Sequence, residues 1–165
     1  MHRDVAAAVA VFADLDGVAD VLDVATGTGL VLRSLHSRRG GLRLAGADLS
    51  PRMLAVARAQ LPTASWIVAD ARSLPVDDCS VDLITCVTAL HVIPDTAGAI
   101  SEWRRVLRPG GRAVTATFLD GGRRRPAPVR PSYPSDHAPF GSVERLERTA
   151  AEGGLSHLPL ADVER

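Results

Sequence analysis

The sequence contains no lysine, so all nineteen of its basic residues are arginine. The nineteen acidic residues balance them, which leaves no net field to attract nucleic acid or a membrane surface. No apolar run approaches the roughly 18–20 residues of a membrane-spanning helix. The first residues have an acid among the basic ones and no long apolar core, unlike a signal peptide.

Cysteine is also scarce. Cys79 and Cys86 are the only two, and they lack the CxxC spacing, which argues against a disulfide framework or a zinc site. We therefore expect a cytoplasmic protein without a bound metal. The chain has 165 residues, which predicts a single domain with one modest core.

Apolar stretches alternate with segments of helical period. This order predicts parallel strands joined by right-handed crossovers, and hence a doubly wound α/β sandwich of three layers. Strands are expected at residues 21–24, 42–47, 65–69, 81–87 and 113–118, and helices at 30–39, 51–61, 96–107 and 142–152. The core spans 21–118, followed by a proline- and arginine-rich flexible loop at 119–141. The C-terminal part, 142–165, is expected to add a helix and a strand at 155–160, without a final antiparallel hairpin strand.

The stretch VLDVATGTGL, residues 21–30, ends a predicted strand in a glycine loop. A phosphate-binding P-loop needs GxxxxGK(S/T), which a chain without lysine cannot supply. The dinucleotide fingerprint GxGxxG would begin at Gly27 and Gly29 but finds Leu32 at its third glycine. A carboxylate at Asp23 would also repel a pyrophosphate, whereas it suits a ligand with a positively charged end.

Two further acids end the next predicted strands. Asp48 follows Gly29 by 19 residues (48 − 29), the position of a carboxylate that accepts hydrogen bonds from ribose hydroxyls. Asp70 is placed to accept from an adenine amine, beside the N–H of Ala71. Since the carboxyl ends of parallel strands line one crevice, we expect Asp23, Asp48 and Asp70 to converge there. An adenosine with a cationic amino-acid tail, S-adenosylmethionine, satisfies all three.

Four segments resemble the class I S-adenosylmethionine-dependent methyltransferases, in particular the branch of ubiquinone- and menaquinone-biosynthesis enzymes and small-molecule methyltransferases. They are VLDVATGTG, GADLSPRMLAVARA, VADARSLPVDDCSVDLITCVTALHVIPD and EWRRVLRPGGRAVTATF, in family order from Val21 to Phe118. Ala25 stands where many members have glycine. The resemblance implies a Rossmann-like fold and cofactor contacts at Asp23, Ala25, Thr26, Gly27, Gly29, Asp48, Leu49, Met53, Asp70, Ala71 and Val87, with Met53 packing on the adenine.

The expected reaction is in-line methyl transfer to a small-molecule acceptor, with proximity and alignment supplying much of the catalysis. His91, just beyond the fourth strand, is the candidate base, although a histidine there can also be purely structural. Cys86 is expected to be a buried apolar residue, and Asp82 to be structural because it begins its strand at the end away from the crevice.

Two alternatives remain open. The chain could bind the cofactor without methylating, as a cyclase, an isomerase or a partner subunit. It could also be a nicotinamide-dependent oxidoreductase, which the missing third glycine disfavours. The acceptor and its reacting atom are not encoded in a recognisable pattern, and a homodimer is a further expectation.

Overall fold

Within the part of the chain that the structure describes, the sheet is five-stranded and entirely parallel. The computed structural model describes residues 2–117 and 138–155. Its strands are β1 (Asp20–Val24), β2 (Arg43–Asp48), β3 (Ser65–Val68), β4 (Val81–Val87) and β5 (Leu107–Ala116). Their order across the sheet is β3-β2-β1-β4-β5. β2 and β3 are therefore added on one side of β1, and β4 and β5 on its other side, so the strand order switches between β1 and β4. This is the predicted doubly wound α/β fold, and folds of this kind bind their ligands where the strand order reverses.

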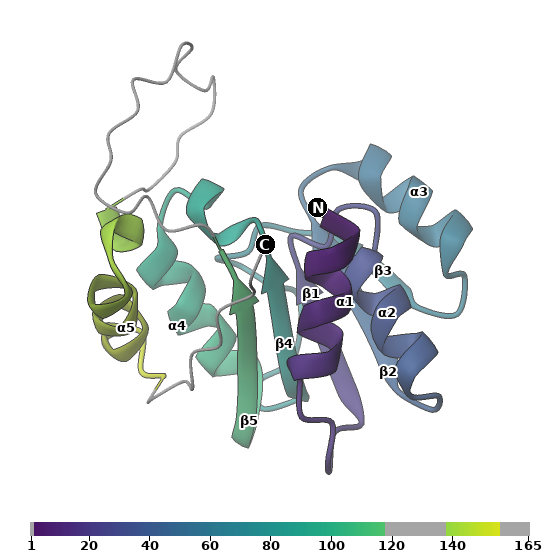
Figure 1. Cartoon of the computed structure of the whole chain (residues 1–165), viewed down its shortest axis with the longest axis horizontal. Helices are drawn as coiled ribbons and strands as arrows, with labels where there is room; N and C mark the ends of the chain where they lie inside the picture. Colours follow the sequence, from purple (N-terminus) through teal and green to yellow (C-terminus); the bar gives the residue numbers. More distant parts are fainter. Residues whose placement is uncertain (1, 118–137, 156–165) are drawn as a thin grey trace.

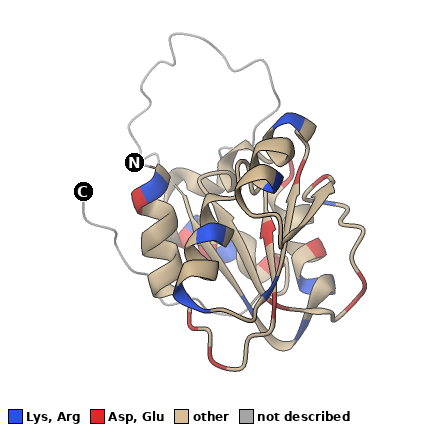
Figure 2. Ribbon diagram, turned by 90° about the vertical axis from the view of Figure 1, so that its right-hand side faces the viewer, with Lys and Arg blue, Asp and Glu red and all other residues tan. Residues whose placement is uncertain are grey.

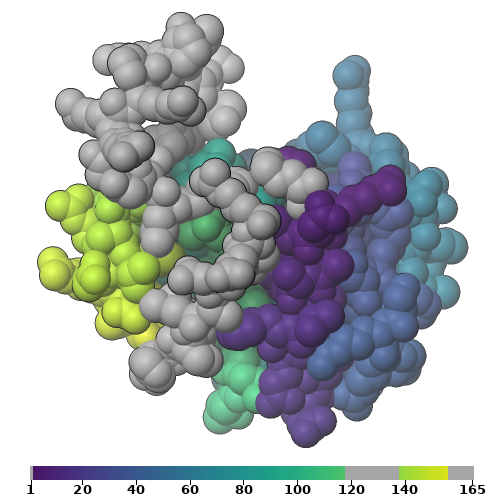
Figure 3. Space-filling model, in the orientation of Figure 1, coloured from purple at the N-terminus to yellow at the C-terminus, as the bar shows by residue number. Residues whose placement is uncertain are grey.

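Helices cover both faces of the sheet (Figure 1). On one face lie α1 (His2–Phe12), α2 (Leu30–Arg38) and α3 (Pro51–Gln60); on the other lie α4 (Thr96–Val106) and α5 (Val143–Glu152). Figure 3 shows α1 and α2 packed side by side on the surface of the first layer. A short 3-10 helix, η1 (Leu90–Val92), follows β4, and another, η2 (Ala138–Gly141), precedes α5. None of the helices within the described residues is both long and apolar enough to span a bilayer.

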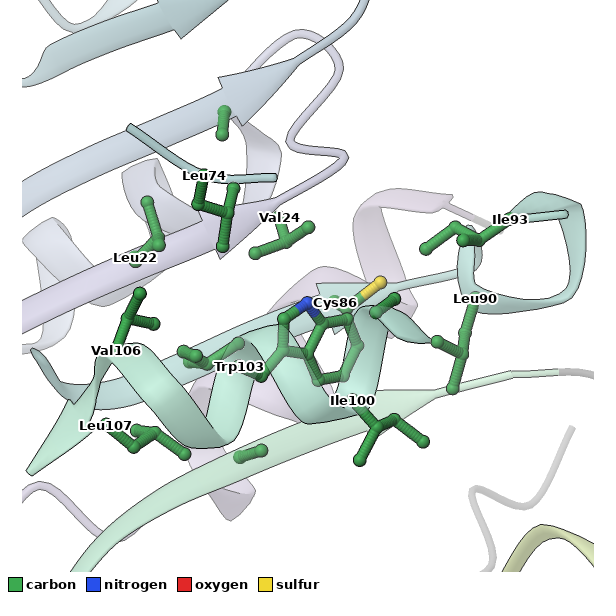
Figure 4. Close-up of a cluster of buried hydrophobic side chains, with 14 of the residues drawn as sticks. Leu22, Val24, Leu74, Cys86, Leu90, Ile93, Ile100, Trp103, Val106 and Leu107 are labelled. Atoms are coloured by element: carbon green, nitrogen blue, oxygen red, sulfur yellow. The ribbon is translucent and has the colours of Figure 1, made fainter. Parts of the chain in front are cut away.

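Two apolar cores result, one on each face of the sheet. The larger includes Trp103 of α4, which has almost no exposed surface and lies among Leu22, Cys86 and Ile100 (Figure 4). The second joins α1 and α2 to the opposite side chains of the same strands, such as Val21 and Leu83. Neighbouring residues of β1 thus face opposite cores, which is why residues 21–24 are apolar except for Asp23.

The predicted start of the last strand is wrong. We expected it to begin at residue 113, because RPGG is a typical helix stop and reads as a loop. The helix does end at Val106, but β5 starts directly at Leu107. Val81 pairs with Leu107 and Leu83 with Arg112, so the extra residues form a bulge in which Gly110 adopts a φ of 80°. A bulge absorbs a proline and glycines that a regular central strand would exclude.

The helix at the N-terminus, α1, had no predicted counterpart. The predicted loop at 119–141 and the predicted strand at 155–160 fall largely outside the described residues. The helix expected at 142–152 is present as α5, and Ser142 caps it by accepting a hydrogen bond from the N–H of Arg145.

Charged groups are interspersed over the described elements rather than gathered on one of them (Figure 2). One network closes the amino-terminal edge of the sheet. The carboxylate of Asp82 accepts from the N–H groups of Ala19 and Asp20, both at 2.8 Å, and from Arg108 at 2.7 Å. Arg108 also donates to Asp20 at 2.8 Å. Asp82 is therefore structural, as expected from its position.

Two glycines allow Trp66 of β3 to lie against the sheet and the glycine loop. A Cβ added at Gly29 or at Gly46 would each lie 2.6 Å from an atom of the Trp66 ring. The indole N–H donates to the carbonyl of Leu61 at 3.2 Å, which fixes the orientation of the ring. Gly29 thus serves the packing of this layer, whatever its backbone does for a ligand.

We expect Gly29→Ala to lower the free energy of unfolding by about 2–4 kcal/mol, because it adds overpacking against Trp66 to the strain of a positive φ. Gly17→Ala is the matched control, since Gly17 has the same φ of 74° but nothing within 4 Å of an added Cβ. It should cost only about 1 kcal/mol. Urea unfolding of both variants measures the difference, and equal losses would contradict the role given to Trp66.

Candidate cofactor-binding site

The loop between β1 and α2 is curled by left-handed backbone and tied to the end of β2. Ala25, Gly27 and Gly29 have φ values of 55°, 56° and 74°. The N–H of Thr26 donates to the carbonyl of Ala47 at 3.0 Å. The next N–H, that of Gly27, donates to the carboxylate of Asp48 at 2.8 Å. The loop and the carboxyl end of β2 therefore form one unit.

Asp48 braces both segments that meet at it. One carboxylate oxygen accepts from Gly27 and the other accepts from the N–H of Ser50, also at 2.8 Å. Ser50 then caps α3 by accepting from the N–H of Met53. A carboxylate has about four acceptor positions, so the half-buried Asp48 retains capacity for hydroxyl donors of a ligand.

Asp23 lies beneath this loop rather than on its surface. Only 1% of the residue is exposed. One carboxylate oxygen accepts from the hydroxyl of Thr26 at 2.6 Å, and the other accepts from the hydroxyl of Thr85 in β4 at 2.7 Å. Burial raises the pKa of Asp23 to about 6, the nearby charge of Asp48 adds to this, and the two hydroxyls oppose it. The site thus holds an acid whose charge a cation above the loop would stabilise.

The two loop glycines have different surroundings. Gly29 is covered by Trp66, whereas an added Cβ at Gly27 would meet no atom within 4 Å. Because none of the described residues covers Gly27, its backbone is the part of the loop that a ligand can approach closely. Its N–H group donates to Asp48, so the ligand would lie beside that carboxylate.

Two large apolar side chains beside Asp48 are unusually open. Leu49 is 69% exposed and Met53 is 47% exposed. Both were predicted to contact the cofactor, and together they offer an apolar surface next to a carboxylate. Such a combination suits a nucleoside, whose base is apolar on its faces and whose ribose carries hydroxyls.

Asp70 has a different partner from the other two acids. Its carboxylate is paired with Arg72 at 2.7 Å, and the hydrogen bonds from this arginine lower its pKa. Ala71 packs partly against the larger core. The structure joins Asp23 and Asp48 through the glycine loop, while Asp70 is held at the end of β3 by its neighbour. Its predicted contact with adenine stays a prediction.

The remaining predicted residues lie around β4. Val87, at the end of the strand, packs partly against the core of α1 and α2. Cys86 is fully buried, and burial raises the pKa of its thiol, so it behaves as the apolar residue that was expected. His91 lies in η1, with its Nδ1 3.4 Å from the hydroxyl of Thr117 and its ring edge-on to Phe140.

Sequence reasoning missed Thr85. It is the one residue of VDLITCV besides Asp82 that carries a polar oxygen in its side chain, and it is completely buried. A hydroxyl in an otherwise apolar strand needs a buried partner, and this could have linked it to Asp23. Among the described residues, no three His, Cys, Asp or Glu side chains gather closely enough to hold a metal ion.

The raised pKa of Asp23 predicts a pH dependence of stability with a definite sign. The folded protein holds the proton more tightly than the unfolded chain, so the contribution of Asp23 is present below pH 4 and is lost as the pH rises through about 6. The free energy of unfolding of the wild type minus that of Asp23→Asn should fall by up to roughly 3 kcal/mol between pH 4 and pH 7. Urea unfolding across this range measures it.

Asp70→Asn provides a control of opposite sign. The pKa of Asp70 is lowered, so its contribution is lost as the pH falls rather than as it rises. A wild-type minus Asp23→Asn difference that stayed constant with pH would show that Asp23 is not destabilised by burial.

Comparison with known proteins agrees with this geometry. A protein family described as a methyltransferase domain matches residues 22–115. The demethylmenaquinone methyltransferase of Thermotoga maritima is 39% identical over 105 residues, which cover 64% of this chain and 46% of that protein. The chain thus spans about half the length of the curated relatives that it matches.

Solved structures of similar fold include a methyltransferase and a cyclase. An amino-pentose methyltransferase of Micromonospora echinaspora, solved with S-adenosylmethionine bound, is 31% identical with a TM-score of 0.61, over 72% of this chain and 52% of that one. The (4+2)-cyclase SpnF is 25% identical with a TM-score of 0.74, over 92% of this chain and 56% of that one. The match to the family spans more than half of the sequence and includes the glycine loop, Asp48 and β4. This chain therefore belongs to the methyltransferase-domain family.

Proposed function

We propose that the protein transfers a methyl group from S-adenosylmethionine to a small-molecule acceptor. The observation that carries this proposal is the unit formed by Gly27 and Asp48, with its open backbone on one side and the exposed Leu49 and Met53 on the other. Within one short stretch of chain, this unit has a backbone that a ligand can approach closely, a carboxylate that can accept hydrogen bonds from ribose hydroxyls, and an exposed apolar surface.

The residues fit the parts of this cofactor in turn. Asp48 would accept from the ribose hydroxyls, and Leu49 and Met53 would pack on the adenine. Asp23, buried under the loop, would stabilise the ammonium and sulfonium charges through the low-dielectric protein rather than by an exposed contact. Asp70 would reach the adenine amine only by sharing its carboxylate with Arg72.

The bound cofactor supplies an electrophilic methyl group, so the chain need not provide a nucleophile. What its residues contribute is position: the loop fixed to β2 holds one reactant, and the ends of β4 and β5 are left for the other. His91 remains the candidate for accepting a proton from the acceptor.

A second function has one specific observation in its favour. The cyclase SpnF resembles this protein over 92% of this chain, although the match covers only 56% of SpnF itself. A non-methylating use of the same cofactor site is therefore the alternative. Cofactor binding without any demethylated product across a panel of acceptors would favour it.

The names of the relatives do not determine which molecule this chain would methylate. Their names point to a demethylmenaquinone in one case and an amino pentose in another. A cytoplasmic location and a homodimer are also proposals, and light scattering at micromolar concentration tests the second.

Isothermal titration should show saturable binding of S-adenosylhomocysteine, the demethylated product. We expect Asp48→Ala to weaken it by about 1–3 kcal/mol, since the variant loses the ribose acceptor and the brace on Gly27. Asp16→Ala, at an exposed turn near the amino edge of the sheet, is the control that should bind normally. Unchanged affinity in Asp48→Ala would refute the assignment.

Gly27→Ala separates ligand approach from folding. Its added Cβ points into open space, so the loss of stability should be only about 1 kcal/mol from the positive φ, whereas binding of S-adenosylhomocysteine should fall at least about tenfold. Gly110→Ala shares the positive φ and the open surroundings, but lies in the bulge of β5. It should match the stability loss and leave binding intact. Parallel losses of binding in both variants would argue against a ligand at Gly27.

A further inference from the structure

Thr85 of β4 lies beside Asp23 of β1, because the two residues are partners in the register of the sheet. Their side chains leave the same face, and the hydroxyl of Thr85 donates to one carboxylate oxygen of Asp23 at 2.7 Å. Thr85 is 0% exposed. It cannot touch a ligand above the glycine loop, so any effect of Thr85 on binding has to pass through Asp23.

The neighbour of Asp23 on its other side is Gly46 of β2, which leaves room for a second donor. A Cβ added at Gly46 would lie 2.9 Å from Cγ2 of Thr26, closer than two carbon atoms normally pack. The hydroxyl of Thr26 donates to the other carboxylate oxygen of Asp23 at 2.6 Å. Each oxygen thus accepts from one hydroxyl, and such bonds stabilise the ionised form of an acid over its neutral form.

The other groups around Asp23 do not stabilise its charge. The nearby carboxylate of Asp48 repels it, and burial itself raises the pKa of Asp23 to about 6. The thiol of Cys86 is close enough to interact with this charge, but burial raises the pKa of the thiol and keeps it neutral. The next side chain in the row, that of Val114 in β5, is apolar. Within the described residues, the two hydroxyls are therefore the groups that favour an ionised Asp23.

We propose that Thr85 is a positioning residue that keeps Asp23 ionised beneath the glycine loop, and that this buried charge makes the site prefer S-adenosylmethionine to S-adenosylhomocysteine. This inference rests on the proposed function and states how that same site selects its ligand. The two molecules share their adenosine and amino-acid groups. They differ in charge only at sulfur, which is a sulfonium in the first and a neutral thioether in the second.

The preference follows from the charge of Asp23 in a poorly solvated position. An ionised carboxylate attracts the sulfonium through the low-dielectric protein, whereas a neutral carboxyl does not distinguish a charged sulfur from an uncharged one. Methyl transfer removes the positive charge from the sulfur. The same carboxylate therefore holds the product less tightly than the substrate, which favours exchange of one for the other after each reaction.

Carbon-13 NMR of the Asp23 carboxyl in the ligand-free protein tests the role of Thr85. The wild type should titrate with a midpoint near pH 6. Thr85→Val replaces the hydroxyl by a methyl group and should raise this midpoint by about one pH unit, because the ionised form loses a hydrogen bond. Thr85→Ser keeps the hydroxyl and should restore it. Thr115→Val is the control, since the hydroxyl of Thr115 donates to the carbonyl of Cys86 at 2.6 Å and not to Asp23.

Isothermal titration with both ligands between pH 5 and pH 7 tests the selectivity, below the range in which α-amino groups titrate. The ratio of the two affinities cancels the contributions of the groups that the ligands share. In the wild type, the preference for S-adenosylmethionine should rise about fivefold from pH 5 to pH 7, as Asp23 loses its proton. At pH 6 it should be about threefold smaller in Thr85→Val than in the wild type.

Asp23→Asn separates Asp23 from the histidines, which titrate over the same range. The variant retains every histidine but has no charge beneath the loop, so its ratio of affinities should stay constant between pH 5 and pH 7. Thr115→Val should follow the wild type at each pH.

The outcomes are distinct. Failure of both ligands to bind contradicts the proposed function and this inference together. Binding of both at a ratio that does not change with pH contradicts this inference alone. Equal weakening of both ligands in Thr85→Val, with an unchanged midpoint for Asp23, would mean that Thr85 only supports the fold. A pH-dependent ratio that persists in Asp23→Asn would assign the selectivity to another group and overturn the inference as well.

Discussion

The carboxylate of Asp23 is the constraint on which the site depends. A buried charge is tolerated only when its oxygens are hydrogen-bonded, and here the hydroxyls of Thr26 and Thr85 satisfy one oxygen each. These two bonds join the glycine loop to β4 across β1. The loop is thereby fixed from below by Asp23 and from the side by Asp48, before any ligand arrives.

The switch point divides the carboxyl edge of the sheet into two chemically different halves. Acids and exposed apolar side chains lie on the β2 and β3 half, where Asp48 ends β2 and Asp70 lies just beyond β3. Threonine and histidine lie on the β4 and β5 half. A two-substrate reaction needs such a division, because each reactant must be recognised by different groups while their reacting atoms meet at the boundary.

Much of the fold was predictable from the sequence, because parallel strands buried on both faces are continuous apolar runs. The caps at Ser50 and Asp95 likewise follow local rules. The start of β5 was missed because the cost of Pro109 and its glycines is absorbed by a bulge, which depends on pairing with β4. In the candidate site, the pattern predicted that Asp23 and Asp48 lie at strand ends and Gly27 in the loop, which is where the structure has them. It could not identify Thr85, whose role arises from a contact between residues more than sixty positions apart.

Trp66 has a consequence for how this sequence can change. Its ring fills the volume that side chains at positions 29 and 46 would occupy, so the three residues share one fixed space across the loop, β2 and β3. A larger residue at either glycine is compatible with the fold only if position 66 shrinks in the same step. Drift at these sites should therefore be concerted, with volume exchanged among them and single replacements selected against.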